Sequence, residues 1–146
     1  MRRIALSFLL LAAPLVAQTT PVEEAQAAID RNDPQAALTV LQRAVAQDPN
    51  NANIHYLLGV AYGNLAEKAS AFRRVSFARH TRDEFEHAVE LDPNHLEARW
   101  ALVQYYELAP GYLGGSEQKA EQQAEEINKR DPSFGKRAFE FLARKK

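Results

Sequence analysis

Asp-Pro pairs divide this 146-residue sequence into similar phrases. They occur at residues 33–34, 48–49, 92–93 and 131–132, and each of the last three ends a stretch with helical spacing of its apolar residues: AALTVLQRAVAQDPNN, DEFEHAVELDPNH and KAEQQAEEINKRDPS. A second kind of phrase, ANIHYLLGVAY and LEARWALVQYY, follows the first two. No stretch alternates polar and apolar residues for long enough to predict a strand. The pattern therefore predicts an all-α fold built from repeated helix pairs.

Local signals place the ends of several helices. Thr20-Pro21-Val22-Glu23 has the form of a capping box, with threonine as N-cap, proline in the first helical position and glutamate three residues after the cap. Asp33-Pro34 repeats the cap and the proline, and Ser116 is expected to cap a later helix. Gly59 has no Cβ, so it predicts a close approach between two helices.

The alternating phrases resemble the tetratricopeptide repeat (TPR), a 34-residue helix–turn–helix unit. Leu58-Gly59 and Tyr62 match the L-G-x-x-Y signature of a unit's first helix, whereas the first unit lacks the Gly and Tyr and the third has Val103 for the Gly. The resemblance implies a repeat domain over residues 18–146, with units at 18–51, 52–95 and 96–134 and a terminal helix at 135–145. The expected fold is thus an all-α helix–turn–helix repeat solenoid of about three TPR-like units with a C-terminal capping helix.

Two units are longer than the repeat. The prolines that close successive units lie 44 and 39 residues apart, ten and five more than the repeat length. The extra residues of the second unit, around 67–80, contain no glycine or proline and are expected to lengthen its helices. Those of the third unit, Pro110–Ser116 after Ala109, have the composition of a loop. We expect both insertions on one edge of the stack, here called the inserted edge, because both fall between a unit's two helices.

The N-terminus has the layout of a secretory signal peptide over residues 1–17. Met1-Arg2-Arg3 is cationic, Ile4–Val16 is an apolar run shorter than a membrane span, and Ala17 offers a small residue at the cut. We therefore expect an exported bacterial protein, periplasmic or secreted, with an uncleaved membrane anchor as the alternative. There are no cysteines, which excludes disulfides, thiolate metal sites and a lipid-modified cysteine.

One polar cluster has the spacing of a metal site. His80, Glu84 and His87 share one helical face and could offer three metal ligands, but that face is expected to point to solvent with no special neighbour of Glu84. We therefore expect no metal and no cofactor. The sequence also contains neither a nucleophile elbow nor a zinc-protease helix, which predicts a protein that is not an enzyme.

An arginine cluster lies in the first insertion. It comprises Arg73, Arg74, Arg79 and Arg82, with Phe72 and Phe77 between them. Arg79–Asp83 and Arg82–Glu86 are spaced for ion pairs along a helix, so a salt-bridged surface is the expected structure. The net charge of −1 gives no strong attraction to nucleic acid, and none is expected as a partner.

The resemblance also implies a binding surface, because TPR proteins usually hold partners in the concave groove lined by the first helices of their units. The residues expected there are Asn53, Tyr56, Asn64, Trp100 and Gln104. Tyr56 and Trp100 take equivalent positions in adjacent units and are suitable anchors for a peptide. Alternatively, Trp100 fills the core between helices. The lysine and asparagine of the chaperone-tail clamp are absent, since Tyr56 and Val60 occupy those positions.

These observations predict a non-enzymatic scaffold or adaptor of the cell envelope that binds a peptide segment or partner protein. One alternative is a small-molecule or metal-binding accessory module on the inserted edge, using Arg73, Arg74 and Tyr112. Another is a short solenoid that self-associates through its ends, because three repeats are near the minimum for stability.

Overall fold

The computed structural model describes residues 19–144, and the predicted signal peptide at residues 1–17 lies outside this part. The expected all-α class is confirmed: residues 19–144 contain seven α-helices and no strand. The helices are α1 (Pro21–Asp30), α2 (Pro34–Gln47), α3 (Ala52–Lys68), α4 (Ala71–Leu91), α5 (Leu96–Leu108), α6 (Glu117–Arg130) and α7 (Pro132–Ala143), with a short 3-10 helix, η1 (Gly111–Leu113), between α5 and α6.

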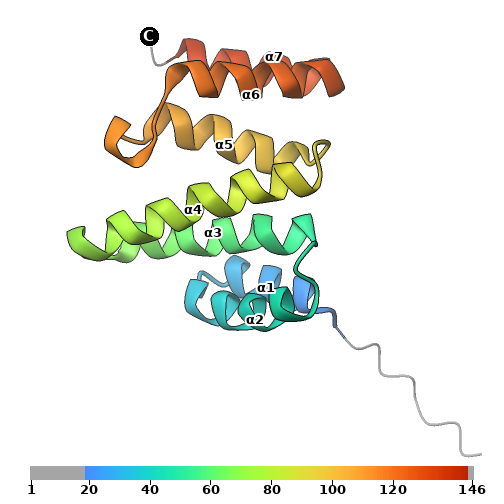
Figure 1. Cartoon of the computed structure of the whole chain (residues 1–146), viewed down its shortest axis with the longest axis vertical. Coiled ribbons are helices and arrows are strands. Elements are labelled where there is room, and N and C mark those ends of the chain that lie inside the picture. Colours follow the sequence, from blue (N-terminus) through green and yellow to red (C-terminus); the bar gives the residue numbers. More distant parts are fainter. Residues whose placement is uncertain (1–18, 145–146) are drawn as a thin grey trace, which may run out of the picture.

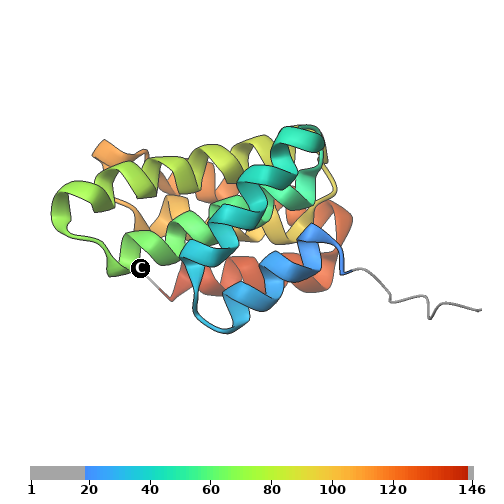
Figure 2. The same cartoon turned by 90° about the horizontal axis from the view of Figure 1, so that it is seen from below.

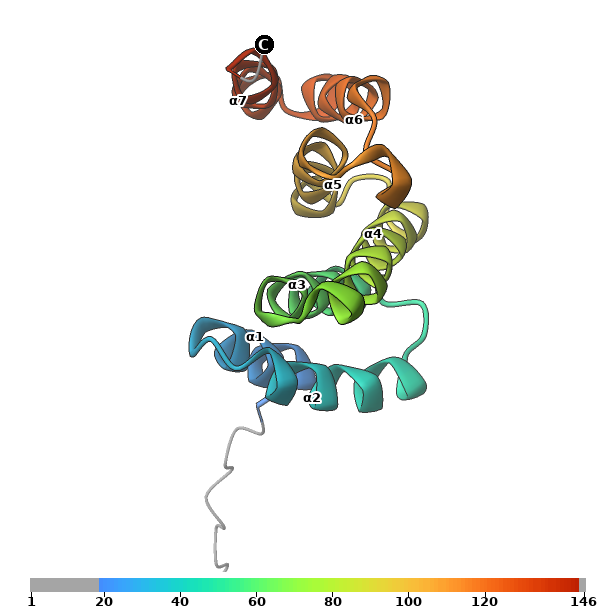
Figure 3. The same cartoon turned by 90° about the vertical axis from the view of Figure 1, so that its left-hand side faces the viewer.

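The helices stack as successive antiparallel pairs, which is the expected TPR-like solenoid. In Figure 1 the pair α1/α2 lies at one end of the stack, α3/α4 and α5 in the middle, and α6/α7 at the other end. Seen from the side, α1 and α7 lie on one side of the stack and α4 lies on the other, so the solenoid is curved (Figure 3). The inner side of a curved solenoid is an extended concave surface.

Polar side chains cap the helices where the sequence predicts. Thr20 and Glu23 form the complete capping box, and Asp33 and Ser116 accept hydrogen bonds from backbone amides in the first turns of α2 and α6. The last helix begins at Pro132 rather than at 135, because the side chain of Asp131 caps it and the proline takes its first position. The last Asp-Pro pair therefore starts a helix, as Asp33-Pro34 does.

Adjacent units repeat one hydrogen bond at their start. The Nε2 atom of His55 lies 2.8 Å from the carbonyl oxygen of Pro49, and the Nε atom of Arg99 donates to the carbonyl oxygen of Pro93 over 2.8 Å. Both side chains are buried, and each is the fourth residue of its helix. The equivalent bonds show that α3 and α5 begin in the same register relative to the turns before them.

Two core clusters hold the stack together. One is formed by α1, α2 and α3, and the other by α4, α5, α6 and α7. Tyr56 packs against both. Gly59 lies directly against the ring of Phe85, where a Cβ added to the glycine would come within 2.5 Å of ring carbons, so the predicted close approach of α3 and α4 is confirmed.

Both insertions lengthen the same edge of the stack. The second unit has the longest helices, with 17 residues in α3 and 21 in α4. Viewed along the stack, the turn between α3 and α4 extends beyond the other pairs, and the η1 loop lies on the same side (Figure 2). The guanidinium of Arg82 on α4 donates to the carbonyl oxygen of Leu113 over 3.2 Å, which ties the loop to the long helix.

One sequence-based expectation about α4 is only partly right, because His80 and His87 are exposed but Glu84 between them is half-buried. The face with His80, Glu84 and His87 was expected to point to solvent, but Glu84 lies 2.7 Å from Nδ1 of the buried His55. The rings of His87 and His55 are 4.3 Å apart, and His80 stacks on Tyr62 at 4.9 Å. This face therefore borders α3, because the two long helices pack along most of their length. Among residues 19–144 no group of three histidine, aspartate or glutamate side chains could hold a metal ion.

Candidate binding groove

A groove of about 700 Å³ opens between α3 and α5. Its walls carry Tyr56, Val60 and Asn64 from α3 and Trp100, Gln104 and Leu108 from α5, and its floor carries Ala78, Thr81 and Phe85 from α4. These residues meet because α3 and α5 are the first helices of adjacent units, and α4 lies between them. The groove also lies at the junction of the two core clusters, where the packing of one ends and that of the other begins.

Two aromatic side chains stand on opposite walls of the groove. Tyr56 is half-buried, with its ring centroid 5.0 Å from that of His95 and 5.9 Å from that of Phe85. Trp100 is also half-buried, and its ring lies 5.2 Å from Phe141 on α7. Trp100 thus lines the groove and also packs against the terminal helix.

Three amide side chains were expected in this groove, and the structure brings two of them to it. Asn64 and Gln104 line it and are partly exposed, so their donors and acceptors face the open space. Asn53 does not line it. Its Oδ1 atom lies 3.0 Å from Nε2 of His95, the N-cap of α5, so this asparagine links the starts of two successive first helices.

The sequence did not indicate the rim formed by the second insertion. Tyr105 and Leu113 line the groove, and the hydroxyl of Tyr105 donates to the carbonyl oxygen of Leu113 over 3.0 Å. The next residue, Tyr106, is buried and donates to Glu86 of α4, and burial together with this hydrogen bond raises the pKa of its phenol. The sequence signal for these contacts was the pair Tyr105-Tyr106. Adjacent residues of a helix point about 100° apart, so the two hydroxyls bond to different neighbours, here the η1 loop and α4.

Few charges border the groove. Glu67, Glu97 and Arg74 line it. The guanidinium of Arg74 keeps its charge and is held at the end of α3 by the carbonyl oxygens of Ala66 and Ala69, to which it donates. Burial, followed by the nearby carboxylate of Glu97, raises the pKa of Tyr56, so its phenol stays neutral and can act as donor and acceptor at neutral pH. The groove is therefore largely apolar, with two carboxylates at its border.

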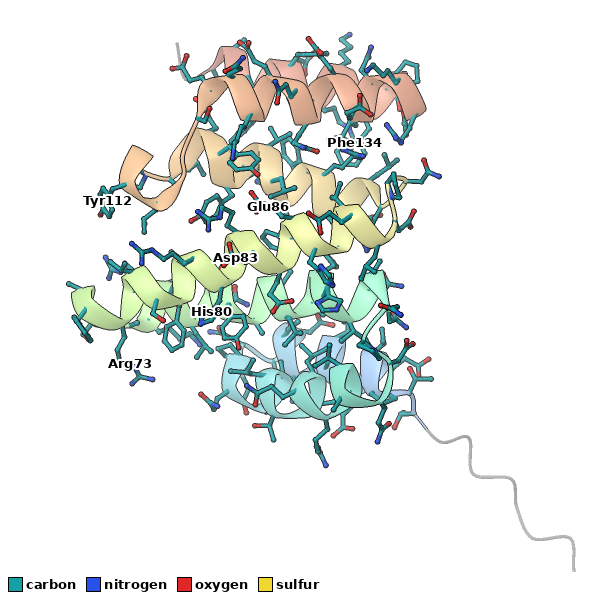
Figure 4. The ribbon with its side chains drawn as sticks, in the orientation of Figure 1. Arg73, His80, Asp83, Glu86, Tyr112 and Phe134 are labelled. Atoms are coloured by element: carbon teal, nitrogen blue, oxygen red, sulfur yellow. The ribbon has the colours of Figure 1, made fainter. Side chains whose placement is uncertain are left out.

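The residues of the alternative edge site are not gathered around a common cavity. Arg74 lines the groove, whereas Arg73 and Tyr112 do not. In Figure 4 Tyr112 projects from the tip of the η1 loop, and Arg73 points away from that loop. Arg73 lies over the ring of Phe77, with its Cζ atom 5.3 Å from the ring centroid. The described part of the chain offers no enclosed site for a small molecule between these three side chains.

Comparison with known families agrees with the architecture. Residues 25–65, from α1 into α3, match a family model described as a TPR repeat. No curated protein matches the chain. No helix in the described part of the chain combines the length and the apolar composition needed to cross a bilayer. The chain thus contains a segment similar to a TPR repeat at residues 25–65, and the solenoid of residues 19–144 has a TPR-like architecture.

Proposed function

We propose that this chain is a non-enzymatic scaffold or adaptor of the bacterial cell envelope, and that it holds a peptide segment of a partner protein in the groove between α3 and α5. TPR repeats generally mediate protein–protein interaction, which supports a scaffold role. The observation that carries the proposal is the meeting of Tyr56 and Asn64 with Trp100 and Gln104 around one open cavity. Aromatic anchors beside amides that face the open space suit a peptide, which offers apolar side chains and backbone hydrogen-bonding groups.

The chemistry of the groove limits its occupant. Phe85 and Val60 provide apolar surface, so the bound segment presents apolar side chains to α4. Among the described residues the border carries two carboxylates, those of Glu67 and Glu97, against the one guanidinium of Arg74. A strongly acidic segment is therefore disfavoured, and affinity is expected to depend weakly on salt.

The sequence of the N-terminus supports the envelope location. Residues 1–17 combine two arginines, an apolar run and a small residue at the cut, which is the layout of an export signal. A reporter enzyme fused after residue 20 should reach the cell exterior or periplasm. Mass spectrometry should find Gln18 or Thr19 at the mature N-terminus, and an intact Met1 in the membrane fraction would contradict cleavage.

Two amide variants test the groove. The partner is identified by co-purification from an envelope extract and then titrated by calorimetry against Asn64→Ala and Gln104→Ala. Each is expected to weaken binding by about 1–3 kcal/mol, or about 5- to 150-fold. Gln122→Ala on α6 is the matched control, because Gln122 is exposed and does not line the groove. Equal losses in all three variants would contradict the proposed site.

The aromatic anchors need a stability measurement beside the titration. Tyr56→Ala and Trp100→Ala are expected to weaken binding by about 1–3 kcal/mol each. Trp100→Ala should also lower the melting temperature, because it removes ring contacts with Phe134 and Phe141. Loss of binding in Tyr112→Ala but not in the groove variants would place the site on the inserted edge instead.

A further inference from the structure

Exposed apolar side chains gather on the inserted edge. Four large hydrophobic side chains are exposed in the described part of the chain, and three of them lie here: Phe72 at 92%, Tyr112 at 72% and Leu108 at 56%. Phe72 is the second residue of α4, Leu108 ends α5, and Tyr112 is the middle residue of η1. Figure 4 shows Tyr112 projecting outward beyond the ribbon, on the side where α4 begins. The fourth, Phe139, lies on the terminal helix.

The first half of α4 adds a local positive charge. Residues 71–82 contain four arginines and no acidic residue, although the whole chain has a net charge of −1. Two of these arginines are engaged: Arg74 with the carbonyl oxygens of Ala66 and Ala69, and Arg82 with Asp83. The other two, Arg73 and Arg79, are exposed and form no hydrogen bond or ion pair with any residue of 19–144.

Phe72 and one of the two free arginines share an orientation, and the other, Arg73, flanks Phe72 at the exposed start of α4. Phe72 and Arg79 are seven residues apart, so they lie on one face of α4. That face is opposite the buried Thr81 and Phe85. The nearby carboxylates of α4 face Arg82, because Asp83 lies 2.6 Å and Glu86 3.9 Å from its guanidinium. Glu67 at the end of α3 lines the groove, so neither Arg73 nor Arg79 is paired with an acidic side chain of residues 19–144.

The shape of the edge favours a planar partner. Phe72 is almost fully exposed, so no pocket surrounds it, and the edge projects beyond the rest of the stack (Figures 1 and 2). An acidic peptide would neutralise Arg73 and Arg79 but leave Phe72 and Tyr112 in water. The interface of an anionic bilayer satisfies both, since apolar tips enter the boundary between headgroups and acyl chains while arginines contact lipid phosphates.

We propose that the inserted edge docks onto an anionic lipid surface, with Phe72 and Tyr112 inserted and Arg73 and Arg79 facing the headgroups. Leu108 and Pro110 belong both to this edge and to the lining of the groove. Docking would therefore hold the mouth of the groove beside the membrane. The inference goes beyond the proposed peptide binding and does not require it, because the lipid contacts use side chains outside the groove floor.

A single fluorescent label tests the proposal. The sequence has no cysteine, so Tyr112→Cys accepts one environment-sensitive dye at the tip of the loop, and Phe139→Cys accepts the same dye at a control position. The chain is used as purified, with its N-terminus identified by mass spectrometry. Vesicles of phosphatidylcholine with one quarter phosphatidylglycerol should shift the dye emission to the blue at position 112 and not at 139. Pure phosphatidylcholine vesicles should cause less than half of that shift.

Additional substitutions in the labelled chain test whether Phe72, Arg73 and Arg79 contribute to vesicle binding. Phe72→Ser, and separately Arg73→Gln with Arg79→Gln, should each weaken the apparent vesicle affinity of the labelled chain at least about threefold. Arg43→Gln, at an exposed position in the second half of α2 and far from the turn between α1 and α2, should not. Circular dichroism checks that each variant is folded. An equal shift at positions 112 and 139, or none at 112 in a folded chain, would overturn the proposal. A shift with a polyglutamate peptide but not with anionic vesicles would identify an acidic partner and also overturn it.

Discussion

The contact between α3 and α4 at Gly59 gives a quantitative test of the repeat packing. A Cβ added at Gly59 would lie 2.5 Å from the Cδ1 and Cε1 atoms of Phe85, which is 6% exposed and has little room to move. One turn later on the same helix, a Cβ at Gly63 would lie 3.7 Å from the side chain of Thr81, an ordinary contact. Gly59→Ala and Gly63→Ala are therefore the same chemical change on one helix, with and without a clash.

The expected energies have opposite signs. Replacing a glycine in a helix interior by alanine stabilises by about 1 kcal/mol through backbone entropy. Gly63→Ala should therefore raise the free energy of unfolding by about that amount. Overpacking a core costs about 1–3 kcal/mol, so Gly59→Ala should lower the free energy of unfolding by about 0–2 kcal/mol. The two variants should thus differ by about 1–3 kcal/mol.

Denaturant unfolding followed by circular dichroism measures both variants. Gly59→Ala should have the lower midpoint, and Phe85→Leu introduced beside it should recover part of the loss, because the smaller side chain relieves the clash. The double-variant cycle should give an interaction energy of about 0.5–2 kcal/mol in the stabilising direction. Equal stabilisation by Gly59→Ala and Gly63→Ala would refute the close packing of α3 and α4 at this point.

Three further outcomes are expected. Leu58→Ala should lower the free energy of unfolding by about 2–5 kcal/mol in the same denaturation assay, because Leu58 is 3% exposed and its loss leaves a cavity in the first core cluster. Hydrogen bonds from Lys129 and Arg130 lower the pKa of Glu126 to about 2 from 4.5, so the small stabilising effect of this carboxylate is complete above pH 4.5 and is lost as the pH falls toward 2. NMR titration of the Glu126 carboxyl carbon should show a higher midpoint in Lys129→Gln, and an unchanged midpoint would contradict this. The pKa of Tyr106 in the folded chain is raised above 10.0. Above about pH 10 the phenol therefore ionises only in the unfolded chain, and the folded chain should lose stability. Tyr106→Phe should reduce this loss in thermal melts at alkaline pH.

The sequence was most informative where a local interaction decides the structure. The caps at Thr20, Asp33 and Ser116 depend on residues within one turn, so their positions could be predicted without tertiary contacts. The same rule, applied to Asp131-Pro132, places the start of α7 correctly. The repeat spacing assigns that pair to the end of the third unit instead, because it counts residues and takes no account of the cap.

The side-chain neighbours of a long helix could not be predicted in the same way. The periodicity of α4 identifies the face opposite Phe85, but it does not show how far α3 reaches around that face. The buried His55 on α3 meets Glu84, and Tyr62 meets His80, because both helices are lengthened by the insertion and pack side by side. Contacts between elements depend on the crossing of two helices, which neither sequence pattern contains alone.

The residues of the candidate groove could be predicted only in part, again because contacts between helices are not contained in the sequence pattern of either one. Repeat positions placed Tyr56 and Trp100 on one surface, since equivalent residues of stacked units share an orientation. They did not show that Asn53 bonds to His95, or that Leu113 of the inserted loop completes the rim. The length of an insertion can be read from the sequence, whereas its path back over the stack depends on tertiary hydrogen bonds such as that from Arg82.

The most direct test of the groove is site-specific photo-cross-linking in the producing cell. Gln104→p-benzoylphenylalanine places a photoreactive ring in the groove between α3 and α5, and Gln122→p-benzoylphenylalanine places it on the exposed face of α6. Mass spectrometry of the cross-linked peptides identifies both the partner and the segment bound. We expect one partner segment with apolar side chains to be captured from position 104 and not from 122. Capture of the same segment equally from both positions, or from 122 alone, would contradict the assignment of the groove as the binding site.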